Sequence, residues 1–261
     1  MSTKAEKAYM NIVAYGGGTD STAMIIECAR RGVKIDHILF ADTGGEKPHT
    51  YQYVKTFSNW CVANGLPEIV TVRKAGNGET LEEDLIRNKS LPSIAYGFKT
   101  CSQKYKIQPQ DKYMNGLDRA KQIWKEGGKV TKFVGYDSIE QTRIKKALLR
   151  EDKKYNLRFP LNEWGITRKD CIEIIKNAGL CLPGKSACFF CPMSRPSEIR
   201  QLNHNYPDLM QRALNMEANA KLKTLKGLAI NAKWADIIAN EELFDEEFAL
   251  VPEMICECYE P

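Results

Sequence analysis

Short apolar runs alternate with helix-like segments through the first two thirds of the chain, and this alternation restricts the fold more than any other feature. The helical segments between the runs read STAMIIECARRG, TYQYVKTFSNWCVANG and LEEDLIR. Strands that alternate with helices predict a parallel sheet with helices on both faces, a Rossmann-like α/β fold. The expected strands cover 10–15, the run from His37, Ile69–Val72, the residues around Phe133 and a short extended piece at 157–164.

From about Thr167 the pattern becomes rich in helices, with RKDCIEIIKNAG first and a cysteine-containing loop at 181–194 after it. We expect two parts, an α/β nucleotide-binding domain over 1–166 and a helical extension over 167–261. The extension carries a CxxC loop and a cysteine-containing tail. With 261 residues, the chain is long enough for one fully buried sheet.

Composition excludes several classes of protein. No apolar run approaches the roughly 18 residues of a membrane span, and MSTKAEKAYMN lacks the hydrophobic core of a secretory signal. We therefore expect a cytoplasmic protein without a membrane partner. Nine cysteines then favour metal or redox chemistry over disulfides, with Cys28, Cys61 and Cys171 as core residues. The net charge of +5 permits an anionic partner without requiring one.

Three glycines stand at the junction between the first apolar run and the first helix, in AYGGGTDSTAM. Glycines there let backbone amides approach a ligand closely, and a helix N-terminus adds partial positive charge, so phosphate is the natural occupant. Thr19, Ser21 and Thr22 can add hydroxyl donors, while Asp20 can cap the helix or hold a metal or a loop amide. The stretch is neither GxxxxGKS/T nor GxGxxG, and a plain turn remains the alternative.

A second motif is Cys188-Phe-Phe-Cys191-Pro192, between two helical stretches. Two thiolates at this spacing can bind one metal ion or one face of a cluster, and Pro192 fixes the chain. Zinc, an iron–sulfur cluster, a redox pair and coincidence all remain open from the spacing alone.

Four segments taken in order carry a family resemblance. The stretch from Tyr15 to Ser21 resembles SGGxDS, and the stretch from Phe40 to Tyr51 resembles DTGxxFPETY. Two later segments, 135–143 and 159–164, resemble GxRxxESxxR and PLxxW. The chain thus resembles the PP-loop adenine nucleotide alpha-hydrolases, in particular the iron–sulfur branch of the phosphoadenosine phosphosulfate (PAPS) reductase family.

The resemblance implies an adenine nucleotide, either ATP or a sulfonucleotide (PAPS or APS), together with Mg²⁺. Asp42 ends a strand beside the glycine loop, so it can coordinate Mg²⁺ or hydrogen-bond the nucleotide, with a plain turn-forming Asp as the alternative. Arg143 can meet phosphate or sulfate oxygens. Two departures stand out, because Gly16 replaces the first serine and Thr19 the usual lysine. The implied nucleotide-binding residues are Tyr15, Gly16, Gly17, Gly18, Thr19, Asp20, Ser21, Asp42, Thr43, Gly135 and Arg143, with Asp20 also a catalytic candidate.

The resemblance also implies a 4Fe–4S cluster. The segment from Cys101 to Pro109 resembles the cysteine, basic residue and proline segment that joins a distant CxxC around one cluster. Its lysines, Lys104 and Lys106, are candidates to face the anionic substrate or the cluster. Three ligands are then Cys101, Cys188 and Cys191. The fourth is open: Cys181, Cys256 and Cys258 are candidates, and an iron without a protein thiolate could hold sulfide or a substrate atom.

Three functions follow as hypotheses. The first is ATP-dependent adenylation coupled to sulfur transfer onto a nucleic acid or a small acceptor, with a cysteine desulfurase as a further partner. The second is a sulfonucleotide reductase that releases sulfite, in which Cys258 or Cys256 attacks sulfur and thioredoxin is the partner. The third is a zinc-stabilised nucleotide- or nucleic-acid-binding protein without turnover. The oligomeric state is not predicted.

Overall fold

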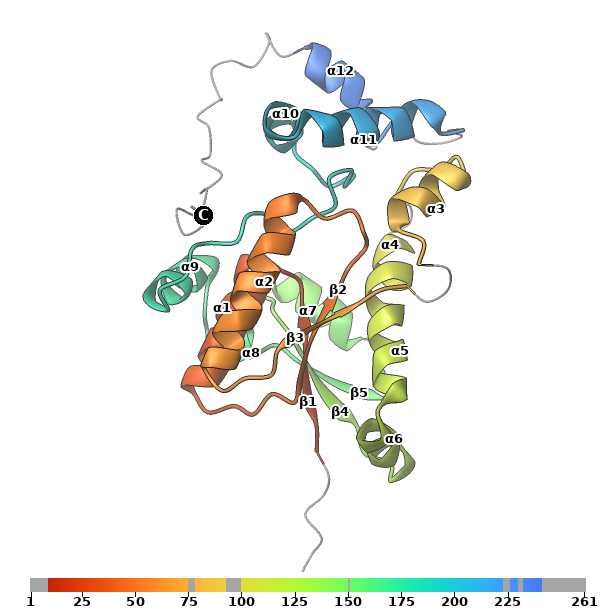
Figure 1. Ribbon diagram of the computed structural model, residues 1–261. Coiled ribbons are helices and arrows are strands. Elements are labelled where there is room, and N and C mark those ends of the chain that lie inside the picture. Colours follow the sequence, from red (N-terminus) through yellow and green to blue (C-terminus); the bar gives the residue numbers. More distant parts are fainter. Residues whose placement is uncertain are drawn as a thin grey trace, which may run out of the picture.

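Five parallel strands form one sheet at the centre of the protein (Figure 1). The computed structural model describes residues 9–74, 78–92, 100–149, 151–222, 226–229 and 232–240. The spatial order is β3-β2-β1-β4-β5, and it confirms the predicted α/β fold. The strands are β1 (Asn11–Tyr15), β2 (His37–Ala41), β3 (Ile69–Val72), β4 (Val130–Val134) and β5 (Tyr155–Arg158).

Every strand pair is parallel, so all carboxyl ends lie at one edge of the sheet. In register, Tyr15 pairs with Phe40 on one side and Ala14 pairs with Val134 on the other. After β1 the chain builds β2 and β3 on one side and then crosses to β4 on the other. The crevice beyond the ends of β1 and β4 is therefore the topological switch point, where open α/β sheets bind ligands.

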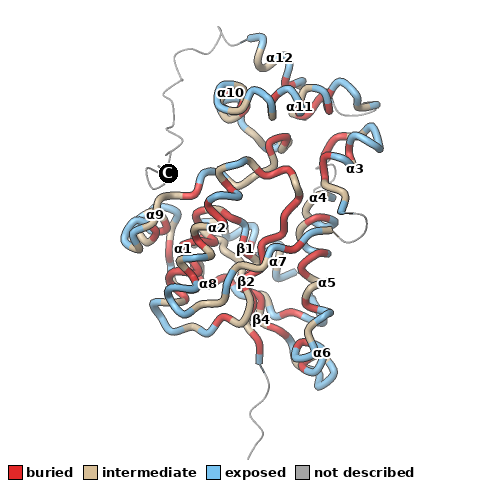
Figure 2. Tube along the Cα trace, in the orientation of Figure 1, coloured by how far each residue is buried: buried red, intermediate tan, exposed pale blue. Residues whose placement is uncertain are grey.

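Helices cover both faces, because successive strand residues point to opposite sides. Phe40 packs in a cluster with α1 (Thr19–Arg30), α2 (Pro48–Ala63) and α9 (Arg168–Asn177). Leu39, its neighbour, packs on the other face with α5 (Gln108–Gly116) and α6 (Asp118–Lys125). Figure 2 shows this burial along the strands and the inner side of the helices. Helix α9 thus shares the main core, although the predicted boundary at 166/167 assigns it to the extension.

A second hydrophobic cluster lies beyond the carboxyl edge, where Figure 1 shows the last helices above the sheet. Phe189 and Phe190, from the CxxC loop, pack at ring centroids 4.7 Å apart within it. Arg212 joins two of its helices by an ion pair with Glu82. The helices are α3 (Leu81–Arg87), α10 (Pro196–Asn205), α11 (Pro207–Asn219) and α12 (Trp234–Ala239).

The structure differs from the sequence-based expectation in two segments. The predicted extended piece at 157–164 is strand only to Arg158, because Pro160 begins a short helix, α8 (Pro160–Glu163). The segment from Thr100 to Lys125, for which no elements were predicted, is largely helical and begins with α4 (Thr100–Ser102) and a π-helical turn, η2 (Gln103–Ile107). Helix α7 (Gln141–Leu148) follows β4. Within the described ranges, no helix has the length and apolar character needed to cross a membrane.

Candidate functional site

The glycine loop joins β1 to α1 at the carboxyl edge of the sheet. Gly17 has φ of +73°, in the left-handed region. A Cβ at Gly17 would lie 3.2 Å from Thr50 Cγ2 and 3.4 Å from Phe40 Cε2. Position 17 therefore needs glycine for its backbone conformation, and the close packing adds to that need. Gly18 is the N-cap of α1 and provides no side-chain cap.

The side-chain hydroxyls of this segment bond to atoms of the same segment. They leave the backbone amides of residues 17–21 without hydrogen-bond partners among the described residues, and we call these the open amides. Ser21 Oγ donates to Gly18 O at 3.1 Å and accepts from Gly16 N at 3.3 Å. Thr22 Oγ1 donates to the same carbonyl at 2.9 Å and lies 3.2 Å from Tyr15 Oη. Among the described residues, no hydrogen bond uses the amides of residues 17–21. These amides lie at the N-terminus of a 12-residue helix, so they form a site suited to an anion.

Gly135 brings the end of β4 against this loop. A Cβ at Gly135 would lie 2.8 Å from both Ser21 N and Ser21 Cα. The predicted residues Gly135 and Ser21 are thus in backbone contact at the switch point. Arg143 has other contacts, because its guanidinium pairs with Glu140 and lies 4.2 Å from the ring centroid of Tyr136.

Asp20 joins two helices. Its Oδ2 lies 2.7 Å from Arg168 Nη1 at the start of α9, and its side chain does not cap α1. Oδ1 is buried and has no hydrogen-bond partner among the described residues. The carboxylate thus ties α9 to the first turn of α1, beneath the open amides.

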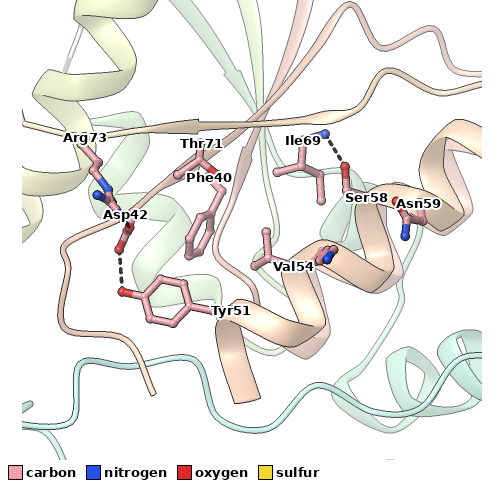
Figure 3. Close-up of a pocket in the computed structure, with 10 residues that line it drawn as sticks. Phe40, Asp42, Tyr51, Val54, Ser58, Asn59, Ile69, Thr71 and Arg73 are labelled. Carbon is pink, nitrogen blue, oxygen red and sulfur yellow. Dashed lines mark hydrogen bonds and ion pairs between the residues drawn. The ribbon is translucent and has the colours of Figure 1, made fainter. Parts of the chain in front are cut away.

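Asp42, just after β2, is 2% exposed and fully bonded. It accepts from Gly44 N and Tyr51 Oη at 2.8 Å each, and from Arg73 Nη2 and Nε at 2.6 and 2.8 Å. A Mg²⁺ ion at Asp42 would have to displace some of these donors. The same carboxylate lies at one end of a pocket of about 370 Å³ between α2 and β3 (Figure 3). Phe40 and Val54 line this pocket and also approach Gly17.

The CxxC loop is bonded to the loop that follows β2. Glu46 and Cys188 form an isolated antiparallel bridge, and Phe189 N donates to Gly45 O at 2.8 Å. Thr43 Oγ1 lies 3.1 Å from Cys188 Sγ. The missing side chain of Gly45 lets the two loops approach each other, since a Cβ there would lie 2.8 Å from the Phe190 ring.

The CxxC loop also contacts the glycine loop. Ser186 Oγ donates to Gly16 O, and a Cβ at Gly18 would lie 3.9 Å from Ser186 Cβ. Ser186 stands two residues before Cys188. The loop that carries the thiols therefore lies beside the open amides.

Cys101 lies in the same region, because its sulfur and those of Cys188 and Cys191 all interact electrostatically with Lys106. Burial lowers the pKa of Lys106, but Glu46 and the sulfurs of Cys188 and Cys101 together raise it above its ordinary value. Burial also raises the pKa of Cys191, and Cys101 raises it further. Burial raises the pKa of Cys188 to about 12. The three predicted thiols therefore lie within electrostatic range of one lysine.

Cys181, the one remaining cysteine candidate that the structure describes, is not brought to this group. Cys181 packs against the main core, whereas Cys101 and Cys188 pack against the second cluster. Cys181 is also disulfide-bonded, so its thiolate is not available as a ligand. The other two candidates, Cys256 and Cys258, lie outside the described residues.

Cys101, Cys188 and Cys191 are the described side chains that would hold a metal centre at this edge of the sheet. Within the part of the chain that the structure describes, no three His, Cys, Asp or Glu side chains are grouped to hold a single metal ion. A zinc ion would need its sulfurs roughly 4 Å apart, since each Zn–S bond is about 2.3 Å. A four-iron cluster is larger, and each thiolate binds a different iron. The three thiols are partly buried near Lys106, whose positive charge would offset part of the negative charge of such a cluster.

Sequence reasoning missed two contacts of the site. Ser186 joins the CxxC loop to the glycine loop, and Glu46 is buried beside Cys188. No local pattern indicates either role, because the partners are far apart in the sequence.

Comparison with protein-family models gives no match for this chain, and comparison with curated proteins gives none either.

Proposed function

We propose that this chain is a PP-loop enzyme of the iron–sulfur branch of the PAPS reductase family. In this proposal it couples ATP-dependent adenylation to sulfur transfer onto a nucleic acid or a small acceptor. One observation carries the proposal: the loop with Cys188 and Cys191 contacts both Gly16 and Thr43, so thiols and open amides share one edge of the sheet. A nucleotide on the amides would have its reacting phosphate beside the thiols.

The proposed roles follow from the contacts. The amides of residues 17–21 would bind phosphate oxygens, and the dipole of α1 would stabilise the charge that develops at the α-phosphate. Gly135 lets the end of β4 pack against the backbone of the glycine loop, so residues that follow both strands would lie beside the phosphates. The pocket beside Asp42, of about 370 Å³, offers room for the nucleoside.

The reaction would begin when an acceptor oxygen attacks the α-phosphate of ATP and pyrophosphate leaves with Mg²⁺. Fixed amides would then hold the adenylated acceptor in place, which removes much of the entropic cost of the second step. Cys101, Cys188 and Cys191 would hold the cluster, which when bound would supply the sulfur that displaces AMP. Lys106 would balance the negative charge of that site.

Anaerobic purification tests the proposal, with iron and zinc measured per chain. We expect a brown protein that contains iron and releases pyrophosphate from ATP when the acceptor is present. A colourless protein with stoichiometric zinc and no turnover would instead support the zinc-stabilised binding protein.

A sulfonucleotide reductase is the second candidate, and the composition of the glycine loop favours it. A Cβ at Gly16 would meet only Ser21 Oγ, at 3.8 Å, so packing does not exclude a serine there. The loop therefore lacks a serine hydroxyl at position 16 although there is room for one. A sulfonucleotide has no pyrophosphate leaving group, so it does not need this extra donor. Sulfite release from a sulfonucleotide with reduced thioredoxin, lost on replacing Cys256 and Cys258 together, would select this function.

A further inference from the structure

Glu46 is a buried carboxylate that is only half satisfied. Its side chain is 0% exposed, and its Oε1 lies 3.5 Å from Lys106 Nζ. Its Oε2 is buried and has no hydrogen-bond partner among the described residues. Buried polar atoms are nearly always bonded, so an orphaned carboxylate oxygen beside thiols is a candidate to bind an ion or a water molecule.

The backbone directs this carboxylate toward the thiols. Glu46 and Cys188 face each other in an antiparallel bridge, so their side chains lie on the same side with Cβ atoms about 4.5–5.5 Å apart. Thr43 contacts the sulfur of Cys188, and Lys106 is close to the sulfurs of Cys188 and Cys101. The carboxylate of Glu46 therefore lies beside Cys188 and Lys106.

We propose that Glu46 is the fourth protein ligand of the cluster held by Cys101, Cys188 and Cys191, and that it binds iron through Oε2. This inference rests on the proposed function, because it requires the cluster. Lys106 would keep Oε1 and orient the carboxylate, as outer-shell partners do at metal sites. A carboxylate is a harder donor than a thiolate, so the iron at Glu46 would be the one that exchanges its ligand.

The test reconstitutes the full metal-free chain anaerobically with ferrous iron and sulfide. Iron and sulfide per chain are measured for the wild type, E46Q, E46C and a control, E82Q. Glu82 is also buried and paired with an arginine, Arg212, whose guanidinium lies 4.8 Å from the centroid of the Phe189 ring. Among the described residues, no hydrogen bond or ion pair joins Glu82 to Cys101, Cys188 or Cys191. We expect about four irons in the wild type, E46C and E82Q, and about three in E46Q. A chelator should remove the iron that is bound roughly tenfold faster from E46Q than from E82Q, because the cluster in E46Q has lost one protein ligand.

Mössbauer spectra of the wild type, loaded with isotopically enriched iron, give a second readout that needs no substitution. One iron environment distinct from the other three is expected, and E46C should abolish the difference. Four equivalent irons, or an E46Q protein with wild-type iron content and spectrum, would overturn the ligand role of Glu46 while leaving the proposed function intact. A wild type that takes up no iron would overturn both.

Discussion

Replacing Gly135 with alanine tests whether the β1–β4 crevice is the nucleotide site. Gly135 does not have a left-handed φ, so alanine can adopt its backbone conformation and the effect is steric. The added Cβ would lie 2.8 Å from Ser21 N, and the crevice must open by about 0.6 Å to restore an ordinary contact of 3.4 Å. The atoms in contact belong to the backbone, so no rotamer change can relieve the clash.

The cost has two parts. Overpacking of this kind destabilises by about 1–3 kcal/mol, and each kcal/mol lowers Tm by about 2–4 °C in a chain of this size. The same shift would stretch amide–phosphate hydrogen bonds, and losing one such bond to a charged group costs about 1.5–3 kcal/mol. We therefore expect ATP affinity to fall roughly 10- to 100-fold.

Isothermal titration with Mg-ATP and thermal unfolding measure the two parts separately. Gly116→Ala is the matched control, because a Cβ at Gly116 meets nothing within 4 Å and its φ is not left-handed. We expect the control to bind ATP normally and to be as stable as the wild type or slightly more so. If G135A unfolds at a lower temperature yet binds ATP as tightly as the wild type, the crevice is not the phosphate site.

Three further predictions test separate parts of the structure. Gly16→Ser should fit without strain and add a hydroxyl donor to the loop, which raises ATP affinity about tenfold in calorimetry; unchanged affinity would contradict a phosphate beside Gly16. Thr167→Ala removes the capping box of α9 and should lower Tm by about 2–4 °C, for a loss of about 1 kcal/mol, and an unchanged Tm would show that this cap contributes nothing. Burial raises the pKa of three core thiols from about 9 to about 12. Their contribution to the free energy of unfolding is therefore complete below pH 9, and it is lost as the pH rises toward 12 because only the unfolded chain ionises them in that range. These thiols are Cys28, Cys61 and Cys171. At pH 8 iodoacetamide should modify them only after unfolding, and their modification in the native protein would contradict their burial.

The sequence predicted the sheet well, because each strand is a short apolar run bounded by polar or glycine residues. The third strand was predicted at Ile69–Val72 and lies there in the structure. The segment from Thr100 to Lys125 escaped prediction because its buried positions include Pro109 and Gln110, which interrupt the apolar pattern of a helix. Its first part is also a π-helical turn, which has no simple hydrophobic period.

The site was only partly predictable. The glycines indicated open amides, but the predicted hydroxyl donor Ser21 bonds Gly18 O instead, and Asp20 pairs with Arg168. The Ser21 bond is local, since serine side chains often bond a backbone carbonyl three or four residues back. The Asp20 pair depends on where a distant helix lies, which local patterns do not specify. The contacts from Thr43 to Cys188 and from Gly16 to Ser186 span 145 and 170 residues, and such pairs arise only from tertiary packing.

The most direct test of the account follows the backbone amides of the isotope-labelled protein by NMR while Mg-ATP is added. If phosphate binds at the N-terminus of α1, the amides of residues 17–21 should shift first and furthest, since they are the open donors there. Saturable binding that shifts other amides and leaves these five unmoved would contradict the account.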